Sequence, residues 1–137
     1  MLVLGAMAWG CGDSVVDPSP SVPPPPREAI SAFQGVQSIF TRSCAFSGCH
    51  SGPAPRAGLD LNPDRFYGSV VRVASTQVPG LFRIDPGRPD SSYLVLKLEG
   101  LAGSVGGIGT QMPLGGQLTR AQIDSVRAWV AAGAPDH

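Results

Sequence analysis

Three residues that can do chemistry lie close together in the segment SCAFSGCHSG, residues 43–52. Cys44 and Cys49 supply two thiols, and His50 directly follows the second of them. These residue types allow three arrangements, namely a local disulfide beside an uninvolved histidine, part of a zinc site, or a covalent haem anchor. The choice among them depends on what else the chain can bring to this segment.

A covalent haem anchor needs two thiols that add to the vinyl groups of haem, and a histidine beside the second thiol that binds the iron. The pair Cys49-His50 provides the second half of such an anchor. The common motif is C-x-x-C-H, whereas here the four residues AFSG separate the cysteines. These residues end in Gly48, which tolerates the backbone dihedrals that a bulge requires. The wider spacing weakens the haem signal without removing it.

An electron-transfer haem held by one histidine usually has a sixth ligand. Beyond residue 11 the chain contains one methionine, Met112, and one histidine besides His50, the terminal His137. We expect Met112 to be the distal ligand, because a loop methionine can reach the far face of the ring and Pro113 fixes the backbone after it. Chain ends usually fray, so His137 is a poor structural ligand.

A disulfide between Cys44 and Cys49 is the main alternative to haem. An exported protein forms such bonds readily, but a disulfide leaves the adjacent His50 and the Met112-Pro113 pair unexplained. A structural zinc site needs about four ligands. After this segment, the potential zinc ligands in the chain are only carboxylates and the terminal histidine. We therefore rank haem first, the disulfide second and zinc last.

The first residues predict export. MLVLGAMAWGC, residues 1–11, resembles the end of a bacterial lipoprotein signal peptide, with Ala8 and Gly10 at the small-residue positions before Cys11. In such proteins the cysteine is lipidated and becomes the first residue, which predicts a membrane anchor outside the cytoplasm. The segment has a short apolar run and no basic residues ahead of it, so we expect the true translation start upstream.

The segment after Cys11 differs in composition from the rest of the chain. Residues 12–27 are rich in proline and serine and predict a semi-extended linker, so the folded domain is expected over residues 28–137. With 18 Gly, 14 Pro and few aromatic residues, that domain should be loop-rich, and a bound cofactor would supplement its small core. Basic and acidic residues balance at ten each, so no basic field for nucleic acid exists.

Apolar spacing predicts a mainly α-helical domain without long strands. The first helix is expected over 28–42, with an apolar face made by Ile30, Phe33, Val36 or Gln37, and Phe40. Short helices are expected within 61–71, with Asn62 as the N-cap, and within 89–98, with Asp90 as the N-cap and Tyr93, Leu94 and Leu98 facing inward. The last helix, within 118–135, should begin with a capping box formed by Thr119 and Gln122 and carry Ile123, Val126, Trp129 and Val130 on its apolar face.

The order of these features resembles a small class I-type cytochrome c domain of an exported bacterial lipoprotein. The matching features are a first helix with IF, C-x4-C-H at 44–50, QMPLGG at 111–116 and a last helix with VRAWVAAGAP. The resemblance implies long loops around one covalent haem c, and first and last helices that cross at Phe33, Phe40 and Trp129. It also implies thioether bonds at Cys44 and Cys49, a proximal His50 and a distal Met112.

The resemblance implies an electron-transfer protein that meets redox partner proteins, rather than an enzyme with a small-molecule substrate. Sequence motifs of hydrolases and metalloproteases are absent. Two alternatives stay open. One is a haem enzyme with an open distal site, should Met112 not bind the iron. The other is a haem-free lipoprotein, stapled by a disulfide, that acts as an interaction module. Arg56 and Arg83 suit haem propionates, but arginines are more often solvated, so neither is assigned.

Overall fold

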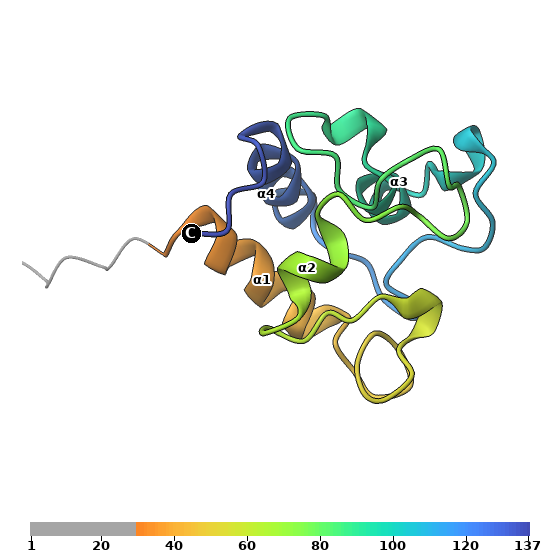
Figure 1. The fold of residues 1–137 in the computed structure, drawn as a ribbon, viewed down its shortest axis with the longest axis horizontal. Coiled ribbons are helices and arrows are strands. Elements are labelled where there is room, and N and C mark those ends of the chain that lie inside the picture. The colour runs from red at the N-terminus through yellow and green to blue at the C-terminus, as the bar shows by residue number, and fades with distance from the viewer. Residues whose placement is uncertain (1–29) are drawn as a thin grey trace, which may run out of the picture.

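The computed structural model of the chain describes residues 30–137, so the predicted signal peptide with Cys11 and the whole predicted linker, residues 12–27, lie outside the described residues. The described part is helical, with long loops and no strand, as the sequence predicts (Figure 1). Its α-helices are α1 (Ala32–Ser43), α2 (Phe66–Val70), α3 (Tyr93–Glu99) and α4 (Arg120–Ala131), and its 3-10 helices are η1 (Arg56–Gly58), η2 (Pro89–Ser91) and η3 (Ala102–Val105).

Helix α1 begins later than the sequence predicts. Ser31 is its N-cap and forms a capping box with Gln34, since each side chain accepts a hydrogen bond from the other residue's backbone N–H. Ile30 therefore lies before the helix and is 72% exposed, so its predicted place on the apolar face is wrong. Val36 and Phe40, both predicted on this face, are confirmed as the buried residues of α1.

Helix α4 confirms the prediction made for it. Thr119 and Gln122 form the expected capping box, and the four predicted apolar residues are all buried. After Ala131 the chain turns at Gly133, whose φ of +96° suits glycine, and the N–H of Ala134 donates to the carbonyl of Trp129 at 3.0 Å. The first and last helices, orange and blue in Figure 1, pack against each other as the sequence analysis expects.

The two middle helices start where tertiary contacts place them, so both N-caps predicted for them are wrong. Asn62 forms a turn, with its carbonyl accepting from the N–H of Phe66 at 2.7 Å, and α2 begins only at Phe66. Asp90 lies in η2 and pairs with Arg127 of α4, while α3 begins after Ser92. The inward side chains predicted for α3 are confirmed as buried, namely Tyr93, Leu94 and Leu98.

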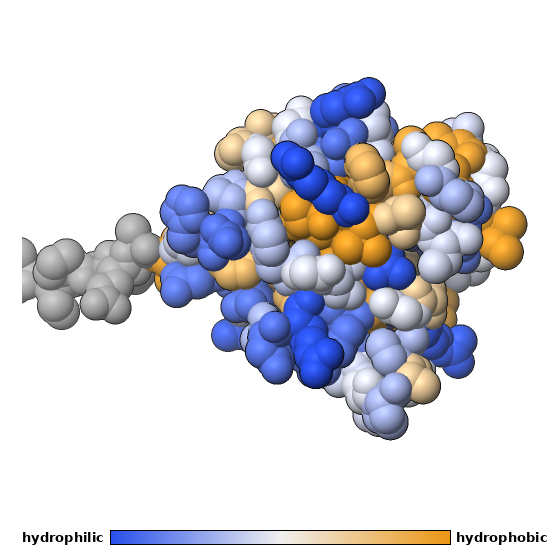
Figure 2. Space-filling model, in the orientation of Figure 1, coloured by the Kyte–Doolittle hydropathy of each residue, from blue (hydrophilic) through white to orange (hydrophobic). Residues whose placement is uncertain are grey.

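The core lies between the four α-helices, α1 to α4. Phe33 and Trp129, both predicted at the helix crossing, have ring centroids 6.3 Å apart, and Phe66 of α2 packs against both rings. Apolar side chains also reach the surface in separate patches on the face shown in Figure 2. Within residues 30–137 no helix is both long enough and apolar enough to cross a membrane.

Candidate functional site

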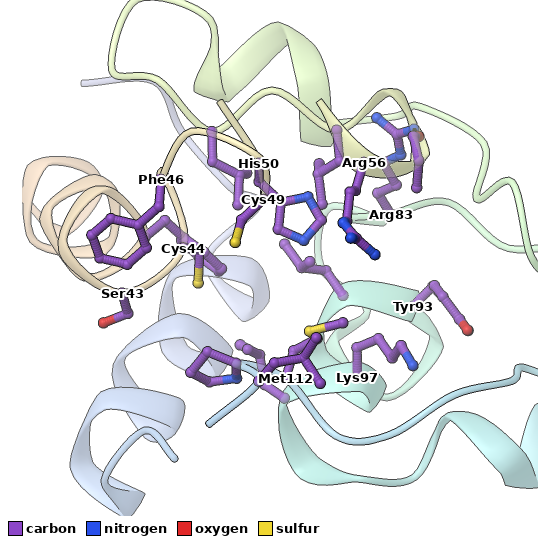
Figure 3. Close-up of a pocket in the computed structure, with 18 of the residues that line it drawn as sticks. Ser43, Cys44, Phe46, Cys49, His50, Arg56, Arg83, Tyr93, Lys97 and Met112 are labelled. Atoms are coloured by element: carbon purple, nitrogen blue, oxygen red, sulfur yellow. Dashed lines mark hydrogen bonds between the residues drawn. The ribbon is translucent and has the colours of Figure 1, made fainter. Parts of the chain in front are cut away.

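A cavity of about 570 Å³ opens beside the core, between the loop that follows α1 and the segment from α3 to Leu114 (Figure 3). Its volume falls in the range of ligand and cofactor pockets, about 300–1,000 Å³. The residues predicted to hold a cofactor all line it: Cys44, Cys49 and His50 from one segment, and Met112 from a distant one. His137 does not line it and is exposed beside Asp136.

The loop that carries the two thiols is a compact bulge. Cys44 caps α1, its N–H donating to the carbonyl of Phe40 at 2.9 Å. The carbonyl of Cys44 accepts from the N–H of Phe46 at 2.9 Å and from that of His50 at 3.3 Å, which closes the loop on itself. Gly48 has a φ of +81°, which confirms the prediction that glycine makes this bulge possible. The four-residue spacer therefore still brings both cysteines to one cavity.

Both cysteines are free thiols with different surroundings. Cys44 is 7% exposed, whereas Cys49 is exposed. Burial, together with the neighbouring Cys49, raises the pKa of the Cys44 thiol from 9.0 to about 11. In Figure 3 the two sulfur atoms point toward the same open space. The structure thus provides two thiols at one wall of the cavity, and burial keeps that of Cys44 protonated near neutral pH.

His50 faces this space from the same wall. Its Nδ1 atom is buried and has no hydrogen-bond partner. Burial lowers the pKa of His50 and the charges of Arg83 and Arg56 act in the same direction, while backbone groups of Leu59 and Arg56 oppose the shift. The ring is therefore neutral near pH 7, and a neutral imidazole is the form that binds metals. The carbonyl of His50 is held by the N–H of Leu61 at 2.8 Å.

Met112 lies across the cavity from His50, with its thioether directed toward the open centre (Figure 3). Its N–H donates to the carbonyl of Lys97 at 3.1 Å, which fixes the backbone at that point. Its side chain is partly buried against the core. An imidazole and a thioether, both predicted from the sequence motifs, thus occupy opposite walls of one cavity.

The charged part of the lining is cationic. The sequence alone left Arg56 and Arg83 unassigned and did not point to Lys97. Arg83 is 8% exposed, and its guanidinium donates to the carbonyls of Ala57, Gly58 and Ser69 at 2.7, 3.2 and 2.8 Å. Lys97 is equally buried, and the exposed Arg56 also lines the cavity.

No Asp or Glu lines the cavity, and none of these three cations has an ion pair with another described residue. Buried cations without carboxylate partners are costly. Their only partners here are backbone carbonyls, so the cavity suits an apolar ligand that carries negative charge. Arginine and carboxylate have matching geometry, which makes carboxylates the natural anions for this wall.

A site for a bare metal ion is not formed in the described part of the chain. No three His, Cys, Asp or Glu side chains of residues 30–137 are grouped as a metal ion would need. The cavity is instead wide, mostly apolar and open on one side, with single potential iron ligands on facing walls. This geometry fits a flat ligand between His50 and Met112 better than a compact four-ligand zinc site.

Comparison with known proteins adds no relative. A scan against protein-family models finds no matching family, and searches of the curated proteins and of the solved structures give no match. The chain is thus established as a small helical domain, and inferences about its chemistry rest on the residues of the cavity.

Proposed function

We propose that this protein is a monohaem cytochrome c, anchored to a membrane outside the cytoplasm, that carries single electrons between redox partner proteins. The observation that carries the proposal is the convergence on one apolar cavity of the two thiols, a neutral imidazole and, from the facing wall, a thioether. Local sequence places the first three together, but only folding brings Met112 to them. A disulfide-stapled interaction module would require none of this arrangement.

Each of the four residues would have a separate role toward the haem. The S–H of Cys44 and that of Cys49 would each add across one vinyl group, forming a C–S and a C–H bond with no leaving group. His50 would be the proximal iron ligand and Met112 the distal one. Bound in this way, a haem supplies a reversible one-electron couple, and methionine ligation raises its potential relative to ligation by two histidines.

The cavity lining fits the remaining parts of a haem. The apolar walls, with Leu59, Leu61 and Leu94, suit the macrocycle. The guanidinium groups of Arg56 and Arg83, which also line the cavity, suit its two propionate groups. Met112 in the distal position also favours electron transfer over an open-site haem enzyme, because an enzyme of that kind needs a free coordination position.

The anchor and the partner follow from features around the domain. Cys11 would carry the lipid, and residues 12–27 would separate the domain from the membrane. Phe46 and Leu114 line the cavity mouth and are exposed, which supports electron exchange with a partner docked there. Redox partners usually meet over small interfaces, so this association should be weak and transient.

The test is an intact mass combined with a visible spectrum of the full chain, made in a bacterial host that has cytochrome c maturation. We expect a mass raised by one haem and colour that stays with the protein after denaturation and acid–acetone extraction. A Cys44→Ala/Cys49→Ala variant made in the same host is the matched control and should lose its colour in the extraction. A colourless wild-type protein, two hydrogens lighter than the reduced chain, would instead establish the disulfide-stapled alternative.

A further inference from the structure

We infer that Lys97 is a positioning residue, which holds Met112 against the iron by fastening the loop that precedes it. This inference rests on the proposed haem site. Lys97 lies in α3 and lines the cavity, and its ammonium donates to the carbonyl of Ile108 at 2.8 Å and to that of Thr110 at 2.9 Å. Its own carbonyl accepts from the N–H of Met112 at 3.1 Å. One residue thus binds three points of a five-residue segment that ends at the proposed distal ligand.

The burial of Lys97 points to a specific task. Lys97 is the only lysine in the chain and is 8% exposed, whereas a lysine without a task usually lies in water. A buried ammonium is normally compensated by a carboxylate, and Lys97 forms no ion pair with any residue of the described part. Its compensation comes from loop carbonyls, so its burial depends on the loop being in place.

The loop in turn depends on outside contacts, because its sequence favours no single conformation. Residues 106–116 read GGIGTQMPLGG, with five glycines, and ordering such a segment costs much conformational entropy. Besides the contacts of Lys97, Gln111 donates through Nε2 to the carbonyl of Leu98 at 2.6 Å. These bonds join the loop to consecutive residues of α3 and set the reach of the Met112 thioether into the cavity.

The test compares Lys97→Met with Lys97→Arg in the full chain, made with cytochrome c maturation. Methionine keeps the length of the stem but removes every donor, whereas arginine keeps the donors. Arg127→Met is the matched control, because Arg127 pairs with Asp90 and Glu99 and bonds no residue of the loop. The readouts are the methionine-to-iron charge-transfer band, the reduction potential and the hydrogen exchange of the Met112 amide.

Selective chemistry gives a further readout that does not need haem. Because Lys97 carries the only side-chain amine, its reaction with an amine-specific reagent reports directly on whether the loop covers it. In the wild-type protein we expect slow labelling, and labelling should speed up under conditions that release the loop before the domain unfolds.

We expect Lys97→Met to retain covalent haem and overall helix content while it loses the charge-transfer band and lowers the potential. Exchange of the Met112 amide should rise by about tenfold or more, the factor expected when charge-assisted hydrogen bonds are lost. Lys97→Arg should restore the band at least in part, and Arg127→Met should leave it unchanged. If Arg127→Met also loses the charge-transfer band, then the loss of the band in Lys97→Met reflects general destabilisation of the protein, and the inference is overturned.

A Lys97→Met protein with an unchanged band, potential and amide exchange would also overturn it. Failure of the proposed function looks different, because the wild-type protein itself would then carry no haem. In that case exchange and amine labelling still report on whether Lys97 fastens the loop, and fast labelling of the folded wild-type chain would overturn that part.

Discussion

The ring of Phe40 packs on the ring of Phe66, with centroids 5.1 Å apart and planes inclined by 33°. Both side chains are fully buried, and Phe40 also lines the cavity. Phe66 has a second aromatic neighbour in Trp129, at 6.0 Å. The short helix α2 thereby joins α1 to α4 and supports the wall from which the first thiol emerges. The core and the proposed haem pocket therefore share a side chain.

Replacing Phe66 with Ala should lower the free energy of unfolding by about 3–5 kcal/mol, because a large buried ring is lost and leaves a cavity between three aromatic neighbours. Denaturant unfolding measures this change. Phe82→Ala is the control, since Phe82 is partly exposed and its loss should cost far less. Equal losses in the free energy of unfolding for the two variants would mean that Phe66 does not have the central packing role in the core described above.

If the proposed haem site is right, Met112→Ala should leave covalent haem in place but change the spin state of the iron and lower its reduction potential, because alanine has no thioether to bind the iron. Visible spectra and redox titration test this. Leu101→Ala, a change at an exposed leucine that does not line the cavity, should alter neither property. An unchanged spectrum in Met112→Ala would remove Met112 from the site and reopen the haem-enzyme alternative.

Helix N-caps that depend on neighbouring residues could be predicted from this sequence, whereas those decided by contacts with distant residues could not. The capping box of Thr119 with Gln122 lies within four residues, and the structure confirms it. Asp90 has a suitable cap residue type as well, but its carboxylate pairs with Arg127, 37 positions away, which no local pattern reveals.

The candidate site shows the same division. The sequence selected the residues that reach the cavity with thiol, imidazole and thioether groups. It left Arg83 unassigned because burial decides its role, and that burial arises from three carbonyls contributed by residues 57, 58 and 69. The role of Lys97 could not be predicted from the sequence for a similar reason, because only the folded loop supplies its hydrogen-bond partners.

Arg83→Met should lower both the yield of haem-loaded protein and the reduction potential of what remains. The change removes a buried positive charge beside His50 that favours both bound carboxylates and the reduced iron, an effect of roughly tens of millivolts. Haem content per protein and redox titration are the measurements. Arg120→Met is the control, because Arg120 is exposed and pairs only with Asp124. A potential that moves equally in both variants would argue against a specific role for Arg83.

Cys11→Ser should release the protein from the membrane fraction, because a serine cannot accept the lipid of a lipoprotein. Fractionation followed by detection of the haem-loaded chain tests this, and Ser14→Ala is a control change in the same segment. Persistent membrane association of Cys11→Ser would show that another part of the chain, or a partner, provides the anchor.

The stability of the haem-free, reduced protein should fall as the pH rises from about 9 to about 11. The thiol of Cys44 ionises near 9.0 in the unfolded chain but near 11 when folded, so the unfolded state loses its proton first and gains stability over this range. The full shift corresponds to about 3 kcal/mol. Water in the adjoining cavity screens part of it, so we expect a loss of about 1–2 kcal/mol. Denaturant unfolding at several pH values measures this loss.

Cys44→Ala should remove the contribution of Cys44 to this loss. Burial also raises the pKa of Tyr93, which contributes in the same direction, so the comparison with Cys44→Ala separates the two contributions. In the haem-loaded protein the sulfur would be a thioether without a proton, so the contribution of Cys44 should be missing there too. If the haem-free wild type and Cys44→Ala lose stability in parallel, Cys44 is not the buried thiol described above. If the haem-loaded protein retains the full loss, its Cys44 is not bonded to haem.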